Sequence, residues 1–421
     1  PYNGPTDAFN FNPYNIFQTP FERFNIFGSG HYELADGIEF YTRGMFSKNK
    51  VETIIAPSGI FGQLALIPVS NPFLPAGARA QFCASNDFDF TTPGVQTLTP
   101  EQCALAAQAT QPGQDVNGDG VADFRAFQTN IGRRLVEAGP RISEFVTTMF
   151  DYRAGLRIGI TDTIGLDLAG AYGESENRQE QQGYTSVSRL RTALYTTSPT
   201  TCNLGPSPTV PNPTNPLLPP LANAGAGTNG CVPVNIFGAA GSISPEAVGY
   251  ITTLAGTAQK SSLAQARALL SGDFGASAPW AEDPIGFALG AEYRNYQAEQ
   301  EADSLSQTAG ELGGAGGATL PFEGGYDVKE VYAEVIAPLV QNRPFFETLT
   351  LEAGIRYSDY SIDAPGSPGY STTTWKGAAT WEPMDGLRFR GNYQRAVRAP
   401  NIGELFAPSN TGLTTVAVDP C

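Results

Sequence analysis

Apolar residues alternate with small or polar residues in segment after segment of the chain, which is the pattern of a β-strand with one apolar face. In residues 349–357, one face carries Leu351 and Ile355, while the opposite face carries Glu352 and Arg356. Such segments run for about 10 to 16 residues, long enough for a tilted strand to cross a membrane. A soluble β-sandwich also alternates, but its strands are nearer five or six residues long. The pattern therefore favours membrane-spanning strands.

The alternation predicts about ten strands and a small number of helices. The strands are expected at residues 23–34, 38–50, 143–160, 164–182, 262–276, 284–301, 326–337, 348–362, 372–381 and 387–397. Two assignments are open. Residues 262–270 are equally compatible with a short helix, and residues 246–254, which follow Ser244 and Pro245, look like a capped helix inside a loop.

The connections between these strands alternate between short and long. The short ones are residues 35–37, 161–163, 277–283, 338–347 and 383–386, and the long ones are residues 51–142, 183–261, 302–325 and 363–371. Outer-membrane barrels combine short periplasmic turns with longer extracellular loops. The sequence therefore predicts an all-β fold, a transmembrane antiparallel up-and-down β-barrel. Residues 1–20 would lead into the first strand, and residues 51–142 and 183–261 would be long extracellular loops with short helices.

Composition and charge narrow the possible functions. No run of 18 or more apolar residues is present, so the sequence predicts no transmembrane helix. The formal charge is −16, and a surface this acidic repels phosphate backbones, so nucleic acid is not expected as a partner. The chain begins at Pro1 rather than Met, from which we expect a processed or truncated N-terminus.

The cysteines point to an oxidising compartment. Cys83, Cys103, Cys202 and Cys231 all lie in loop-like stretches, which favours the disulfides Cys83–Cys103 and Cys202–Cys231 over free thiols. Cys421 is the odd cysteine at the last position, and we expect its partner to lie outside this sequence.

Signatures of enzymes are nearly absent. The single histidine, His31, cannot form a zinc triad or a paired-histidine site, although a lone histidine could still act as a base. The chain has no Gly-x-Ser-x-Gly motif and no phosphate-binding loop, and the glycine-rich residues 313–317 lack the strand and helix that such a loop requires. We therefore expect no enzymatic activity and no required cofactor.

One loop resembles a calcium-binding loop. Side-chain oxygens stand at loop positions 1, 3, 5 and 9, a backbone carbonyl at position 7 and a turn glycine at position 6, supplied by Asp115, Asn117, Asp119, Asp123, Val121 and Gly120. Position 12 is Ala126, so the bidentate carboxylate of such loops is missing. A structural calcium site and a solvated acidic turn are both compatible with this pattern.

Residues 391–406 resemble the mid-barrel signature of TonB-dependent receptors, because a strand is followed by Arg398-Ala399-Pro400 and then by Glu404-Leu405-Phe406. Further similarities are to receptors of Caulobacter-like and sphingomonad-like bacteria, at residues 11–15, 56–59, 231–238 and 286–294. These segments extend from near the start of the chain to near its end, so the resemblance covers essentially the whole sequence.

The resemblance implies a location in the outer membrane of a Gram-negative bacterium, in contact with its lipid. In this family an N-terminal plug fills a 22-stranded barrel, and TonB, with ExbB and ExbD, couples uptake to the proton-motive force. About ten strands cannot close such a barrel. The chain is therefore expected to be a central barrel fragment, with the plug, the TonB-binding region and the C-terminal strands outside it.

The resemblance further implies energised import of an extracellular nutrient, such as a siderophore, cobalamin or an oligosaccharide. Charged residues would line the path or form salt bridges in the barrel interior; the candidates are Arg153, Arg157, Arg356, Arg388, Arg390 and Glu292. No ligand-binding residue is carried over from the family. The alternatives are a passive porin-like or structural outer-membrane barrel and, less compatible with the strand lengths, a secreted β-protein.

Overall fold

The computed structural model describes residues 9–86, 88, 97–208, 229–366 and 368–409. Ten long antiparallel strands follow one another in a single sheet, in the order β1-β2-β5-β6-β7-β8-β10-β11-β12-β13, and the short β9 pairs with β6. Their bounds are β1 Phe21–Ala35, β2 Ile38–Ile55, β5 Arg141–Gly159, β6 Ile164–Ser186, β7 Thr252–Ser277, β8 Pro284–Ala302, β9 Leu312–Gly313, β10 Phe322–Arg343, β11 Phe346–Ile362, β12 Gly369–Met384 and β13 Leu387–Arg395. The predicted all-β, up-and-down antiparallel topology is confirmed.

The strands extend beyond the segments in which the sequence alternates. Strand β6 continues to Ser186 and β7 begins at Thr252, so the helix considered for residues 262–270 is wrong. The connection that was expected to span residues 183–261 is accordingly shorter, as is that of residues 51–142. Many of the extra residues are polar or small, such as Thr252, Thr253 and Gln259, and they remain in the sheet because ladder hydrogen bonds join backbone groups whatever the side chains are.

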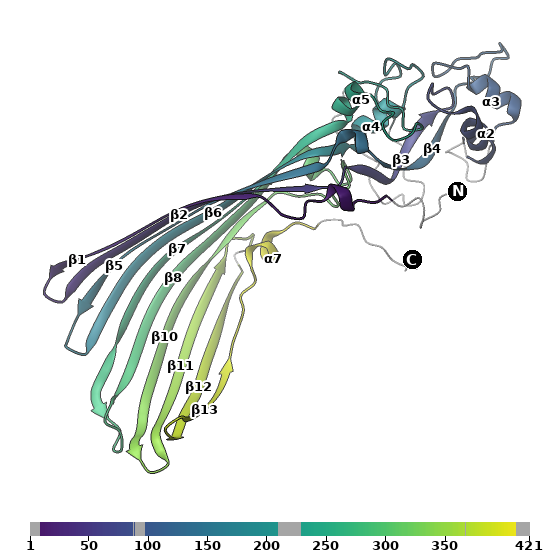
Figure 1. Ribbon diagram of the computed structural model, residues 1–421. Helices are drawn as coiled ribbons and strands as arrows, with labels where there is room; N and C mark the ends of the chain where they lie inside the picture. Colours follow the sequence, from purple (N-terminus) through teal and green to yellow (C-terminus); the bar gives the residue numbers. More distant parts are fainter. Residues whose placement is uncertain (1–8, 87, 89–96, 209–228, 367, 410–421) are drawn as a thin grey trace.

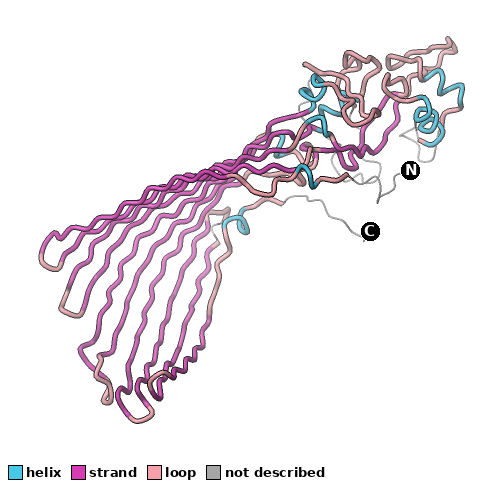
Figure 2. Tube along the Cα trace, in the orientation of Figure 1, coloured by secondary structure: helices cyan, strands magenta, loops and turns pink. Residues whose placement is uncertain are grey.

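The sheet is twisted and curved, and its two ends differ (Figure 1). Tight turns join the strands at one end, for example the Asp36-Gly37 turn between β1 and β2, in which Gly37 has a φ of 71°. The long connections and all helices of the described residues lie toward the other end (Figure 2). These ends are called the turn end and the loop end below. Within the described residues, β1 and β13 are the edges of the sheet.

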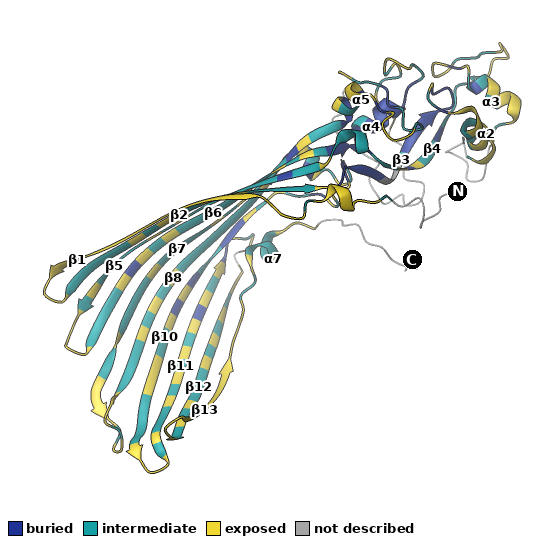
Figure 3. Ribbon diagram, in the orientation of Figure 1, coloured by how far each residue is buried: buried dark blue, intermediate teal, exposed yellow. Residues whose placement is uncertain are grey.

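The two faces of the sheet differ in chemistry. One face carries ion-paired side chains on successive strands and is called the polar face; it includes Glu39, Arg157, Asp167, Arg267, Glu292, Arg294, Glu330 and Arg356. The opposite, apolar face carries Leu289, Val331 and Ile355, whose exposed fractions are 49%, 56% and 54%. Figure 3 shows this half-exposed sheet beside a buried core at the loop end. An exposed apolar face opposite a polar one is the arrangement of a barrel wall in lipid.

The buried core belongs to a compact unit at the loop end, which we call the loop domain. It comprises the described parts of residues 56–140 and 187–251. Its elements are β3 Gly59–Pro68 and β4 Ala126–Arg134, which form a separate hairpin-like sheet, with α2 Ala76–Ser85, α3 Pro100–Ala106, η2 Val136–Ala138, α4 Val187–Leu194 and α5 Pro245–Ile251. Its fully buried side chains include Ile60, Ile67, Phe127, Leu190 and Ile251. Two sequence-distant connections therefore share one core.

Helix α5 begins where the sequence predicts a capped helix, since the Ser244 hydroxyl accepts the N–H of Ala247, but it ends at Ile251 rather than at residue 254. Disulfides join Cys83 to Cys103 and Cys202 to Cys231, as predicted. The remaining helices are η1 Asn12–Tyr14, α6 Ser304–Gln307 and α7 Ile402–Phe406. Among the described residues, no helix is both long and apolar enough to cross a membrane. Cys421 lies outside the described residues.

Candidate functional site on the polar face

The polar face carries a charge cluster near the turn end. Arg157 of β5 forms ion pairs with Glu39 of β2, at 2.6 Å between Nη1 and Oε1, and with Asp167 of β6, at 3.9 Å between Nε and Oδ2. Arg267 of β7 contacts the same Asp167 carboxylate at 3.2 Å. Directly opposed residues share a face of the sheet, and the register pairs Arg157 with both Glu39 and Asp167. Four strands are thus linked by charge.

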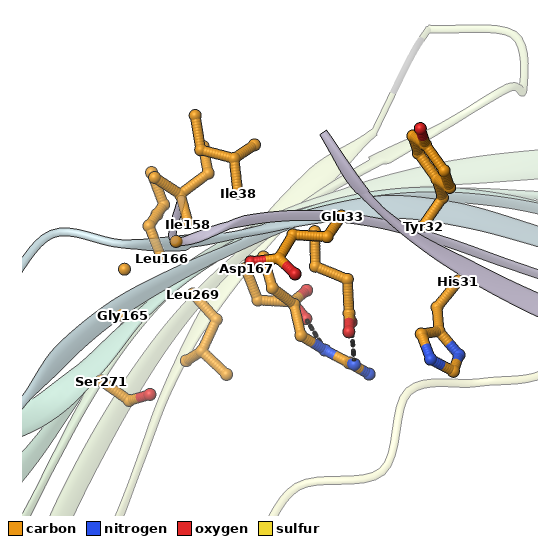
Figure 4. A pocket seen from close by; sticks show the side chains of 14 residues that line it. His31, Tyr32, Glu33, Ile38, Ile158, Gly165, Leu166, Asp167, Leu269 and Ser271 are labelled. Carbon is orange, nitrogen blue, oxygen red and sulfur yellow. Dashed lines mark hydrogen bonds and ion pairs between the residues drawn. The ribbon is translucent and has the colours of Figure 1, made fainter. Parts of the chain in front are cut away.

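This cluster borders a hollow of about 910 Å³ (Figure 4). His31, Asp167 and Leu269 lie on one side of the strands in this view, whereas Ile38 and Tyr32 lie on the other. His31 stands opposite Tyr41 in the register and lines the hollow, and among the described residues it belongs to no cluster of metal-ligating side chains. The hollow therefore offers polar and charged contacts at the turn end.

A glycine explains how Arg157 is held. Tyr41 lies opposite Gly155, and a Cβ on Gly155 would meet the Tyr41 ring at 2.6 Å. The ring can therefore lie across the neighbouring strand, where its hydroxyl donates to Asp167 at 3.1 Å. The Arg157 guanidinium lies over the ring, 4.3 Å from its centroid. The aromatic ring and the carboxylates together fix the position of one cation.

A second charge cluster lies in the middle of the polar face, around Glu330 of β10. The Glu330 side chain is only 3% exposed and is ion-paired with Arg294 and with Arg356, the latter at 3.4 Å. Ser358 donates a hydrogen bond of 2.6 Å to the same carboxylate. Arg294 also contacts Glu292, which stands opposite Glu330 in the register, at 3.3 Å. Arg294 thus compensates two carboxylates that would otherwise repel each other.

The same packing of a tyrosine ring over a glycine occurs in this central cluster. Tyr332 lies opposite Gly290, and a Cβ on Gly290 would meet the Tyr332 ring at 2.0 Å. Arg356 lies over that ring, 4.6 Å from its centroid. In both clusters of the polar face, a tyrosine ring and carboxylates therefore position a compensated cation.

The predicted interior residues all fall on this face, but they have different partners. Arg157, Arg356 and Glu292 belong to the two clusters just described. Arg153 faces Arg43 across β2 and β5, while Arg388 pairs with Glu382 at 2.6 Å near the turn end. Arg390 stands opposite Thr380. Sequence reasoning missed Glu330, although its place in the alternation of β10, two residues from Val328 and Tyr332, was a usable signal.

The three longest connections meet where the sheet joins the loop domain. Glu311, which is 2% exposed, accepts hydrogen bonds from the hydroxyls of Ser186, at 2.5 Å, and Ser188, at 2.8 Å. The Ser58 hydroxyl donates to the carbonyl of Gly313 at 2.7 Å. These buried bonds tie the connection between β8 and β10 to both segments of the loop domain.

The calcium-like loop lies in the loop domain between α3 and β4. Asp115 accepts the backbone N–H groups of Gly118 and Gly120, and Asp123 accepts that of Val116. The N–H of Gly120 holds the pKa of Asp115 below its usual value. Among the described residues, no group of three or more His, Cys, Asp or Glu side chains is placed to hold a metal. Asn117, Asp119 and Val121 complete the motif, and calcium binding there stays a prediction.

The long antiparallel strands, the exposed apolar face and the ion-paired polar face define the wall of an outer-membrane β-barrel. The family model described as TonB dependent receptor-like, beta-barrel, matches residues 104–420, and the chain belongs to this family. It is therefore an outer-membrane protein of a Gram-negative bacterium.

Among solved structures, the chain is similar to the siderophore receptor PiuA from Acinetobacter baumannii, with 11% sequence identity and a TM-score of 0.28. The match covers 89% of this chain and 48% of that receptor. The chain thus spans about half the length of the receptor that it matches.

Proposed function

We propose that this chain forms part of the wall and of the extracellular surface of a receptor that imports a nutrient through the outer membrane with energy supplied by TonB. Two observations support the proposal: the chain belongs to the TonB-dependent receptor family, and the charged side chains on its polar face form ion pairs with one another. The first carries most of the weight. The nutrient classes are a siderophore, cobalamin or an oligosaccharide. We also propose that the receptor belongs to the subfamily of Caulobacter-like and sphingomonad-like bacteria.

The loop end is assigned to the cell exterior. Long connections of outer-membrane barrels are extracellular and short turns are periplasmic. Both disulfides lie in the loop domain, and disulfides persist in oxidising compartments such as the periplasm and the cell surface. The loop domain has its own core, so it can present a fixed surface to a ligand before the ligand reaches the barrel.

The turn end is where the wall would contact a plug. The hollow lined by His31, Glu33 and Asp167 faces the side that a plug would occupy, and it is polar enough to pair with a polar partner. The neighbouring cations Arg157 and Arg267 are already compensated by carboxylates. Such a wall can bind a plug through hydrogen bonds without a large excess of either charge, which suits a contact that TonB must loosen.

The test is accumulation of labelled probes by cells that carry the intact receptor. The probes are a ferric siderophore, cobalamin and a panel of oligosaccharides. We expect one probe class to accumulate only when the receptor gene is present, and to stop accumulating when TonB is deleted or a protonophore is added. Deletion of the receptor gene alone is the matched control.

Two results would contradict the proposal. Uptake that depends on the receptor but is indifferent to TonB and to protonophore would indicate a passive pore. A large, steady conductance of the purified protein in planar bilayers would lead to the same conclusion, because a plugged receptor keeps its barrel closed.

A further inference from the structure

Four tyrosines form a continuous row on the polar face toward the loop end. The row consists of Tyr296 on β8, Tyr326 on β10, Tyr360 on β11 and Tyr370 on β12. The ring centroids of Tyr296 and Tyr326 are 4.9 Å apart, those of Tyr326 and Tyr360 6.3 Å, and those of Tyr360 and Tyr370 4.5 Å. We call this set the tyrosine row. It crosses four neighbouring strands toward the loop end, which is the proposed extracellular side.

The rings stand on edge. Tyr296 is directly opposed to Tyr326, and Tyr360 to Tyr370, while Tyr326 and Tyr360 are diagonal neighbours. The separations within the opposed pairs are close to the spacing of adjacent strands, roughly 4.8 Å, and the planes of Tyr360 and Tyr370 differ by only 6°. The ring faces are therefore turned toward one another. Ring edges and hydroxyls, not flat faces, project from the wall.

Most hydroxyls of the row have no hydrogen-bond partner among the described residues. Arg294 donates to the hydroxyl of Tyr296 at 3.1 Å. Within the part of the chain that the structure describes, the hydroxyls of Tyr326, Tyr360 and Tyr370 have no hydrogen-bond partner, and none of these hydroxyls is fully buried. A phenolic hydroxyl both donates and accepts. The row thus offers a line of hydrogen-bonding groups at intervals set by the strands.

Within the described residues, the guanidinium that contacts the row is not free for an anionic ligand. Val328 and Ile362, which stand opposite Tyr360 and Tyr326 in the register, are only 1% and 8% exposed. The adjacent guanidinium of Arg294 is already engaged by Glu330 and Glu292. A ligand with many hydroxyls and no charge suits this surface, because its groups can donate to or accept from each phenol, and its C–H groups can contact the ring edges.

We propose that the tyrosine row is a binding track for an uncharged oligosaccharide. The inference rests on the proposed import function and names the ligand class of the same interior surface. The row crosses the strands in one line, so a linear sugar chain can contact several tyrosines at once.

The test uses the intact receptor, extracted in detergent, and a panel of hexasaccharides: maltohexaose, xylohexaose, laminarihexaose and chitohexaose. We expect at least one to bind. The triple variant Tyr326→Phe, Tyr360→Phe and Tyr370→Phe keeps the ring stack and removes three hydroxyls, so we expect its Kd to rise tenfold or more. Its thermal unfolding midpoint should be unchanged, because the hydroxyls bond to no described protein group. Tyr357→Phe on the apolar face is the matched control and should bind like the unaltered receptor.

Two outcomes would overturn the inference: no hexasaccharide binds the unaltered receptor, or the triple variant binds as tightly as the unaltered one. TonB-dependent uptake of a ferric siderophore or of cobalamin, without sugar binding, would overturn the track and leave the proposed import function standing. Sugar binding together with uptake that does not depend on TonB would support the track and overturn the proposed import function.

Discussion

Replacing Phe127 by alanine should make local unfolding of the loop domain far more frequent and leave the sheet intact. Phe127 is fully buried on β4, where its ring stacks on Phe82 of α2 at a centroid distance of 4.2 Å and meets Phe88 edge-on at 6.5 Å. Truncating a buried phenylalanine to alanine costs about 3 to 5 kcal/mol. A cost of about 4 kcal/mol corresponds to a roughly thousandfold rise in the open population, since each 1.36 kcal/mol is a factor of ten.

The assay is amide hydrogen exchange of the purified receptor, read peptide by peptide. When opening and closing are fast, the exchange rate follows the open population. We therefore expect amides of β3 and β4, such as the paired residues Ile67 and Phe127, to exchange roughly a thousand times faster in the variant. Amides in β10 and β11 should not change, because no core residue of the loop domain lies on those strands.

Val121→Ala is the matched control. Val121 lies in the same connection but is 58% exposed, so its truncation should change stability by less than about 0.5 kcal/mol. The reasoning is refuted if Phe127→Ala leaves exchange in β3 and β4 unchanged. It is also refuted if β10 and β11 lose protection to the same extent, because the loop domain would then not unfold independently.

Three further changes test the loop domain. Replacing Cys202 and Cys231 by serine removes a disulfide between residues 29 positions apart and should destabilise the domain by roughly 3 kcal/mol. Protease resistance of the receptor measures this loss. Burial tends to raise the pKa of Glu137, but backbone N–H groups and Arg133 outweigh it and lower the pKa below 4.5. The stability that Glu137 contributes should therefore persist above pH 4.5 and be lost as the pH falls further, as calorimetry can follow. Calcium should raise the calorimetric midpoint of the unaltered receptor but not that of Asp115→Ala.

Each of these has a contradicting result. An oxidised receptor no more resistant to protease than the double serine variant would show that the bridge contributes nothing. Identical pH profiles for the unaltered receptor and Glu137→Gln would remove the carboxylate from the pH dependence. Equal midpoints with calcium and with chelator would leave the Asp115 loop as a solvated turn.

The sheet could be predicted from the sequence because its signal is local. Alternation with a period of two needs only the neighbouring residues, and every predicted long strand is present. The ends of the strands were less predictable. Thr252 and Thr253 lie well before residue 262, where the strand was expected to begin, yet they pair with β6 through the backbone. Hydrogen bonding continues where the hydrophobic pattern stops, so strand length was underestimated.

The loop domain could not be predicted, because its core is assembled from positions far apart in the chain. Ile67, Phe127 and Leu194 are buried in one cluster, although each belongs to a short element with little periodicity of its own. The cysteine pairs were predictable, since both members of each pair lie in the same connection. Short elements supported by distant partners give no pattern within a single sequence window.

On the polar face, alternation predicts which side chains share a surface but not which of them pair. The pairing depends on Gly155 and Gly290, because each leaves room for a tyrosine from the next strand to lie across it. Each tyrosine then receives a guanidinium, from Arg157 or Arg356, whose other contact is a carboxylate. The same device thus fixes a cation in both charge clusters of the polar face. Since those charges are compensated within the wall, we expect a ligand to be recognised by other groups, and the tyrosine row offers three hydroxyls that have no partner among the described residues.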